Sequence, residues 1–186
     1  MATIFTHPVV ALAAMPWFRD VKNSRTTLFV GMLLTILPDL DVIGFRLGIP
    51  YDHFWGHRGF THSLFFAVCL GALVALLMSR SLTIKTILLW LYFSLCTASH
   101  GFLDAFTNGG LGVAFFSPFA EARHFFSVNP IEVSTLSITR FFQGQGQAVL
   151  KSELLWIWLP CLAVMMSGLL LMKVIKRYRS GRPEQL

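Results

Sequence analysis

His100 and Asp104 combine two residue types that bind divalent metals, and they lie four positions apart at the end of an apolar segment. On a helix, residues at i and i+4 share a face, so the imidazole and the carboxylate would point into the same volume. The alternative is a polar pair that lines a water-filled cavity without metal. Two further polar clusters favour the metal, because ionisable groups at membrane depth are costly and mark functional sites.

The first of these clusters is Pro38-Asp39-Leu40-Asp41, which interrupts another apolar segment. Residues two apart on a regular helix face nearly opposite directions, so both acids reach one site only if the proline has ended the helix. We expect Asp39 to be a metal ligand. Asp41 is expected to be a second ligand, a general base, or the partner that orients a histidine. The alternative is that both acids mark an interfacial helix end.

The second cluster is His57-Arg58-Gly59-Phe60-Thr61-His62-Ser63, in which two histidines flank a glycine turn. Thr61 stands where an N-cap would precede the next helix, which puts His62 in the first helical turn. We expect His57 and His62 to bind metal, the alternative being histidines of a surface loop. Arg58 is expected to stabilise negative charge on a substrate, unless it only extends toward the membrane interface.

The remaining three histidines differ in their surroundings. His7 lies just before Pro8 and is a further candidate ligand, the alternative being a solvent-exposed tail. His53 and His124 have no partner at a suitable spacing and are predicted to lie at the membrane interface. Nitrogen and carboxylate ligands together suit Zn²⁺, with Mn²⁺ or Fe²⁺ as alternatives. A glycine-rich phosphate loop, a nucleophile elbow and an HExxH pattern are all absent from the sequence.

The composition is that of a membrane protein, because 55% of the 186 residues are hydrophobic, 13% are charged and the mean hydropathy is +0.65. A membrane span needs about 20 apolar residues. We therefore predict one all-α domain over residues 1–186, an integral membrane helical bundle with four or five transmembrane segments. These are Thr3–Phe18, which is short and either crosses or re-enters, Thr26–Gly48, Ser63–Ser79, Thr86–Phe106 and Leu154–Met172.

The basic residues predict the orientation of these segments. The net charge of +6 would suggest a nucleic-acid partner in a soluble chain, but the positive residues concentrate in particular loops, so topology explains them and no nucleic acid is expected. One side would carry Arg19, Lys22, Arg25, Arg80, Lys85 and the basic tail 173–186, and the other Arg46, Arg58, Arg123, Arg140 and Lys151, spread over longer loops. This predicts an outer N-terminus, a cytoplasmic C-terminus and a metal site at the outer-leaflet ends of the helices.

Residues 107–152 form the long outer segment of this map. Residues 111–128 are rich in phenylalanine, with charged residues among them, a mixture that suits an amphipathic flap in the lipid headgroup layer. The last span, 154–172, and the tail would complete the chain.

These motifs together resemble the YdjM family of bacterial and archaeal membrane proteins, which are classed as membrane-bound metal-dependent hydrolases and of which some are LexA-regulated. The resemblance runs from about His7 to Phe119 and is carried by Pro-Asp-Leu-Asp, His-Arg-Gly-Phe-Thr-His-Ser, the His100–Asp104 pair, Thr107-Asn-Gly-Gly110 and Ser117-Pro-Phe119. It implies an inner or plasma membrane location and a site facing the periplasm or the outside. The matching site positions are His7, Asp39, Asp41, His57, His62, His100 and Asp104.

The family is also distantly similar to the zinc phospholipase C and P1 nuclease superfamily. Those enzymes bind zinc through an early histidine, an aspartate, a histidine and a His-x-x-x-Asp pair in the same chain order. They also have a later His-x-x-x-Glu/Asp pair, which this chain lacks, because Val128 stands four residues after His124. The resemblance therefore implies one or two ions rather than three.

We expect a hydrolase in which a metal-activated water cleaves a phosphoester of a lipid-like substrate. Two other classes remain open. One is a non-catalytic metal-binding membrane protein, a stress sensor or scaffold, and the other is an ion transporter lined by histidine and aspartate. Transport is disfavoured because Ser63–Ser79 and Leu154–Met172 carry no polar residue through the membrane depth beyond a few serines.

Overall fold

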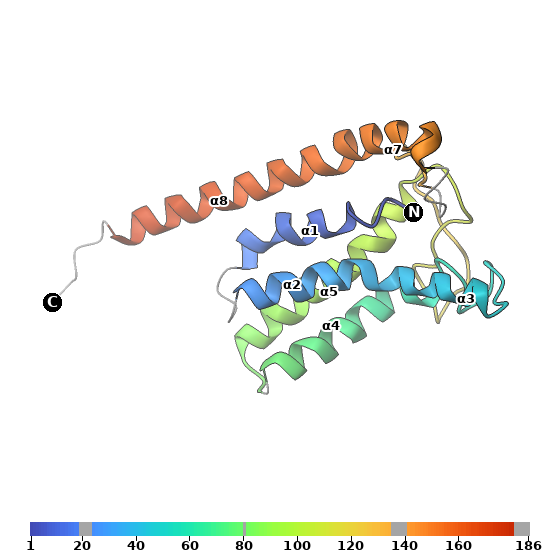
Figure 1. The fold of residues 1–186 in the computed structure, drawn as a ribbon. Helices are drawn as coiled ribbons and strands as arrows, with labels where there is room; N and C mark the ends of the chain where they lie inside the picture. The colour runs from blue at the N-terminus through green and yellow to red at the C-terminus, as the bar shows by residue number, and fades with distance from the viewer. Residues whose placement is uncertain (19–23, 80, 135–140, 181–186) are drawn as a thin grey trace.

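The computed structural model describes residues 1–18, 24–79, 81–134 and 141–180. Within these ranges the chain is helical, apart from its connecting loops and two isolated β-bridges, Thr107 with Ile131 and Val113 with His124. The α-helices are α1 (His7–Ala14), α2 (Ser24–Ile36), α3 (Ile43–Arg46), α4 (Leu64–Ser79), α5 (Ile84–Ala105), α7 (Gly146–Glu153) and α8 (Leu159–Ser180) (Figure 1). The predicted all-α fold is confirmed.

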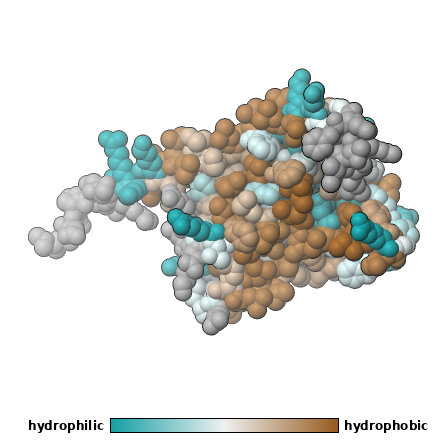
Figure 2. All heavy atoms as spheres, in the orientation of Figure 1, coloured by the Kyte–Doolittle hydropathy of each residue, from teal (hydrophilic) through white to brown (hydrophobic). Residues whose placement is uncertain are grey.

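Among the described residues, three helical stretches are long and apolar enough to cross a membrane. They are Ser24–Arg46, Ile84–Ala105 and Gly146–Tyr178, and two shorter apolar helical stretches, His7–Phe18 and Leu64–Ser79, lie beside them. Hydrophobic side chains cover most of the bundle face seen in Figure 2. A helical membrane bundle is therefore confirmed. That Leu64–Ser79 also crosses, and that the first stretch either crosses or re-enters, stay predictions.

The helix that carries Asp39 and Asp41 changes character at Pro38. Regular α2 ends at Ile36, and the chain continues as a 3-10 helix over Leu37–Val42 before α3. Proline cannot donate the i to i−4 hydrogen bond and its ring crowds the preceding turn. The prediction that the regular helix ends before the two acids is correct, and the tighter turn allows both to face the same region.

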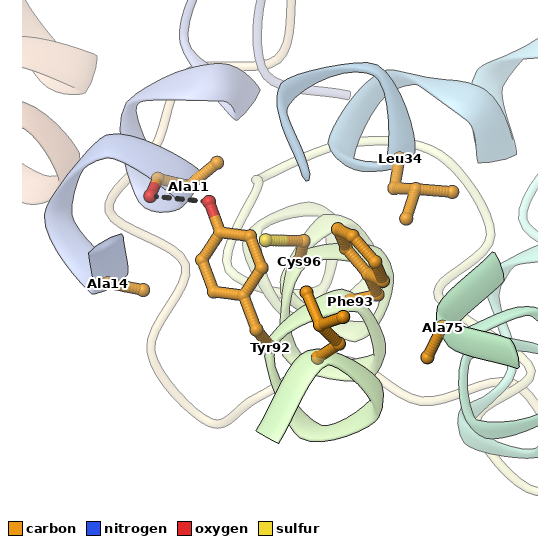
Figure 3. Packing of buried hydrophobic residues seen from close by; sticks show 8 residues of the cluster. Ala11, Ala14, Leu34, Ala75, Tyr92, Phe93 and Cys96 are labelled. Carbon is orange, nitrogen blue, oxygen red and sulfur yellow. Dashed lines mark hydrogen bonds between the residues drawn. The ribbon is translucent and has the colours of Figure 1, made fainter. Parts of the chain in front are cut away.

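Small residues set the close packing of the bundle. An ideal Cβ on Gly71 of α4 would lie 2.7 Å from the backbone nitrogen of Ser94 on α5, so the two helices could not approach as they do if residue 71 had a side chain. Tyr92 of α5 lies at the centre of the core, where its hydroxyl donates a 3.0 Å hydrogen bond to the carbonyl oxygen of Ala11 in α1 (Figure 3). Such contacts are the usual basis of helix association in lipid. They fix α1, α4 and α5 relative to one another.

The start of α4 differs from the prediction. The helix begins at Leu64, and Ser63 caps it by accepting a 3.0 Å hydrogen bond from the amide of Phe66. Thr61 is not the cap, because its hydroxyl donates to Asp41 at 2.8 Å. His62 accordingly lies in the 3-10 helix Phe60–His62 and not in the first turn of α4.

The outer segment and the last span have different limits from those predicted. Residues 107–134 form loops, but the chain is helical from Phe141, so the last part of the predicted flap 107–152 belongs to a helix. A π-helical turn at Phe141–Gln145 precedes α7, and a second one at Leu154–Trp158 connects α7 to α8. Helix α8 extends past residue 172 to Ser180. Arg19, Lys22, Arg80, Arg140 and residues 181–186 of the tail lie outside the described residues.

The two ends of the bundle are distinct. Figure 1 shows the end of α4, the start of α5 and the C-terminal half of α8 toward one end of the molecule. The first residues of the chain, α3 and the irregular loops gather at the other end. The candidate site residues all belong to elements of this second end.

Candidate metal centre

Four donor residues meet at the end of the bundle where the loops gather. They are Asp39 from the 3-10 helix after α2, His62 from the 3-10 helix before α4, and His100 and Asp104 from the last turns of α5. One ligand atom from each lies within 4.8 Å of all the others. The 3-10 turns are what bring the first two residues to the helical pair. The i, i+4 pair thus points into one volume, as the sequence predicts.

The separations between these atoms suit a shared ion. His100 Nε2 lies 3.2 Å from Asp39 Oδ1 and 3.9 Å from Asp104 Oδ2. His62 Nε2 lies 3.9 Å from Asp39 Oδ1 and 3.7 Å from Asp104 Oδ2. Bonds of about 2.0–2.1 Å to a tetrahedral Zn²⁺ place its ligands about 3.3–3.4 Å apart. A small decrease in the longer of these separations would therefore place all four ligand atoms at bonding distance from one metal ion.

The same atoms are buried without hydrogen-bond partners. Among the described residues, both carboxylate oxygens of Asp39 and the Nε2 atoms of His62 and His100 make no hydrogen bond of normal geometry, although His100 Nε2 lies 3.2 Å from Asp39 Oδ1. Buried polar atoms are almost always paired, and each exception calls for an explanation such as an ion. Three residues of one cluster share this property, so the donor set fits a divalent cation.

Both histidines are oriented by a contact on the other side of the ring. Nδ1 of His100 lies 2.7 Å from the carbonyl oxygen of Thr35, which can only accept, so Nδ1 carries the proton and Nε2 is free to bind a metal. Nδ1 of His62 lies 3.1 Å from Oδ2 of Asp41, and this contact likewise leaves Nε2 of His62 facing the centre. Such partners behind a ligating histidine are typical of metal sites.

Electrostatics favour the metal-binding form of His62. Burial lowers the pKa of this imidazole, and the adjacent Asp41 carboxylate opposes the shift without cancelling it. A lowered pKa favours the neutral ring, which is the form that binds a cation.

Asp41 accepts hydrogen bonds from several groups and contacts the His62 ring at Nδ1, the nitrogen that does not belong to the four-donor group. Its Oδ1 lies 2.7 Å from His57 Nδ1, and its Oδ2 accepts from the Thr61 hydroxyl at 2.8 Å and from the Arg58 amide at 3.2 Å. Together with His57 and His62 it forms a second group of possible ligands. The Nδ1 atoms of His57 and His62 both contact Asp41. Of the three roles predicted for Asp41 (second ligand, general base or orienting partner), this geometry favours the orienting one. His57, whose Nδ1 faces Asp41, lies outside the four-donor group.

Arg58 is buried and paired with a ligand. Its side chain is 1% exposed, and Nε donates to Asp104 Oδ2 at 2.9 Å. The two terminal nitrogens donate to the carbonyl oxygen of Gly109 at 2.8 Å and to the hydroxyl of Thr107 at 3.0 Å. Its φ of 62° is unusual for a residue with a side chain. These contacts favour holding Asp104 in place. The predicted contact of Arg58 with a substrate stays a prediction.

His7 lies next to the four donors. Its ring stacks on His100 with centroids 3.9 Å apart and is fully buried, and neither nitrogen has a hydrogen-bond partner in the part of the chain that the structure describes. It is adjacent to the four-donor group but not part of it. His53 and His124 have exposed side chains and lie outside both groups.

Two contributors to the centre are absent from the sequence-based prediction. The Thr35 carbonyl is a backbone group that no residue type announces. Glu153, buried at the end of α7, accepts hydrogen bonds from the residues just before His7. Its signal was present in the sequence, because it is a carboxylate at the edge of an apolar run, as Asp39 is.

The chain has clear relatives among known proteins. The family described as YdjM inner membrane protein matches residues 1–179. The inner membrane protein YbcI of Escherichia coli (strain K12) is 36% identical over 165 residues, which is 89% of this chain and 95% of the relative. No solved structure shows significant similarity. The match and the apolar helices together support an inner membrane location for this chain.

Proposed function

The chain belongs to the YdjM inner membrane protein family, and from this premise we propose that it is a membrane-bound metal-dependent hydrolase. Its centre is Asp39, His62, His100 and Asp104. The observation that carries the proposal is the set of buried, unpartnered donor atoms at metal-ligand separations. A divalent cation in such a site supplies a hydroxide nucleophile near neutral pH by lowering the pKa of water. Zn²⁺ is the proposed ion because two imidazoles and two carboxylates match its usual ligands.

The protein's own groups have distinct tasks in this scheme. The Thr35 carbonyl and Asp41 hold the two imidazoles with Nε2 toward the centre. Arg58 balances the charge of Asp104 and fixes its position. The bundle excludes bulk water from the donors, which strengthens every interaction with a charged ligand.

The proposed substrate is a phosphoester of a lipid-like molecule. The similarity of the metal-binding motifs to those of zinc phospholipase C supports the phosphoester, and the inner membrane location supports a lipid. The loop whose Ala114 amide donates to the Arg58 carbonyl also carries exposed aromatic side chains that would contact lipid, Phe119, which is 80% exposed, and Phe116, which is 55% exposed.

A non-catalytic metal-binding role is the second candidate, and the burial of the donors favours it. His62, His100 and Asp104 are each at most 2% exposed. Structural zinc sites are closed by protein ligands, whereas catalytic sites keep one position open. With His7 stacked beside the donors, the protein has enough ligands to close the coordination sphere.

Elemental analysis of purified protein in lipid nanodiscs tests the centre. We expect one or two divalent ions per chain in the wild type and in the control His124→Ala, whose histidine is exposed, and a loss in His100→Ala and Asp104→Ala. A panel of phospholipids and soluble phosphoesters then tests activity with the loaded protein. Cleavage that His100→Ala abolishes supports the hydrolase. Bound metal without cleavage of any panel member favours the non-catalytic role, and unchanged metal in both site variants refutes the centre.

A further inference from the structure

Glu153 is a buried carboxylate that binds the first residues of the chain. Its side chain is 1% exposed. It accepts hydrogen bonds from the hydroxyls of Thr3 and Thr6, each at 2.7 Å, and from the amide of Thr3. Trp158, one helical turn further, donates a 2.9 Å hydrogen bond to the same Thr6 hydroxyl. A buried carboxylate needs several such donors to offset its lost hydration.

The residues that Glu153 holds lead directly to the metal centre. We call residues 2–7 the N-terminal strap. At one end of the strap, the Ala2 amide donates to Asp104 Oδ1 at 3.2 Å. At the other end, His7 stacks on His100. The strap therefore contacts two of the four donors, and Glu153 binds the two threonines that lie between these contacts in the sequence.

We propose that Glu153 is a positioning residue of the metal centre, acting through the strap on Asp104, His100 and His7. This inference rests on the proposed metal centre. Three accepted hydrogen bonds fix the backbone and both threonine hydroxyls between α7 and the end of α5. Without them, the Ala2 amide and the His7 ring lose the support that sets their positions against the donors.

The use of a carboxylate here supports a positioning role. Replacing a buried charged group with an apolar group of similar volume is often neutral or stabilising, so packing alone does not require a glutamate. A carboxylate with three donors does define one register of the strap, because only one arrangement satisfies all of them. The packing of the Ala2 side chain against Ile131 and Ile157 is non-directional and does not set this register.

Cobalt binding by the full-length protein in nanodiscs tests the inference. Co²⁺ reports ligand number and geometry through its visible absorption and replaces zinc in such sites. We expect Glu153→Ala to weaken Co²⁺ binding about tenfold, as changes behind metal ligands do, and to alter the absorption bands. Glu153→Gln, which keeps one acceptor oxygen, should fall between this variant and the wild type. The matched control is Glu132→Gln, whose exposed carboxylate accepts from Asn108 at 2.8 Å.

A double-mutant cycle separates positioning from general destabilisation. If Glu153 acts through the strap, adding Glu153→Ala to His7→Ala should weaken binding less than it does in the wild type. Thr3→Val removes one donor without removing the carboxylate and should shift the Co²⁺ spectrum in the same direction, which keeps the test available if Glu153→Ala does not fold. Wild-type Co²⁺ affinity and spectrum in both Thr3→Val and Glu153→Gln would overturn the inference. So would fully additive effects of Glu153→Ala and His7→Ala on Co²⁺ affinity. A wild-type protein that binds no Co²⁺ or Zn²⁺ would instead refute the metal centre itself.

Discussion

Replacing Asp41 with asparagine should weaken metal binding without removing a direct ligand of the four-donor group. The carboxylate contacts His57 Nδ1 at 2.7 Å and His62 Nδ1 at 3.1 Å through different oxygens. Asparagine has one oxygen, so its amide nitrogen must face a group that now donates to Asp41. At least one of the two imidazoles then loses its partner or turns.

The expected loss of metal affinity is taken from substitutions of other residues that hydrogen-bond to metal ligands. Such substitutions cost roughly 10–100-fold in metal affinity, which corresponds to about 1.4–2.8 kcal/mol of binding free energy. The loss should be largest if His62 turns, because its Nε2 is one of the four donors. A loss through His57 alone should be smaller, since that ring lies outside the four-donor group.

Competition with a chromogenic zinc chelator measures this affinity for protein in nanodiscs. Asp52→Asn is the matched control, because Asp52 is exposed and belongs to neither group of possible ligands. Thermal unfolding of the metal-free variants shows whether both remain folded. Wild-type affinity in a folded Asp41→Asn protein would refute the orienting role. An equal loss in Asp52→Asn would show that the effect is not specific to the centre.

Three further expectations concern stability, packing and topology. Arg58→Gln should lower the stability of the metal-free protein by about 3–5 kcal/mol in chemical unfolding, because it removes the charged side-chain partner of a buried carboxylate. Gly101→Ala should lower metal affinity in the chelator assay, because an ideal Cβ would lie 2.7 Å from the carbonyl oxygen of His62. In a cysteine-free background, a membrane-impermeant maleimide should label Phe119→Cys but not Leu82→Cys in intact spheroplasts, since both side chains are at least 80% exposed and the predicted topology places them on opposite sides. Labelling only at position 82 would show that the orientation in the membrane is opposite to the predicted one.

The donors were predictable because each one interrupts an apolar run. In a chain that is 55% hydrophobic, a carboxylate or imidazole next to a span is conspicuous, and the helical period then pairs His100 with Asp104. Pro38 likewise announces the end of regular helix before Asp39. These inferences use only local chemistry, so they hold without knowledge of the tertiary structure.

The supporting contacts were not predictable in the same way. The acceptors that surround Arg58 lie 46 to 51 positions away in the sequence, so no local pattern indicates them. Its predicted contact with a substrate stays a prediction. The exchange of Thr61 for Ser63 as the cap of α4 has a similar origin. Asp41, distant in the sequence, binds the threonine hydroxyl, and the next available hydroxyl then caps the helix.

The exposure of the donors bears on how a substrate would approach. The side chain of Asp39 is 7% exposed, whereas those of His62, His100 and Asp104 are fully buried. The two Asp39 oxygens are themselves buried and lack a hydrogen-bond partner among the described residues. Among the four donor residues Asp39 thus lies nearest the surface, beside Leu40, which is 61% exposed. A route that passes an exposed apolar residue suits a lipid-like molecule entering from the membrane better than a polar solute arriving through the loops.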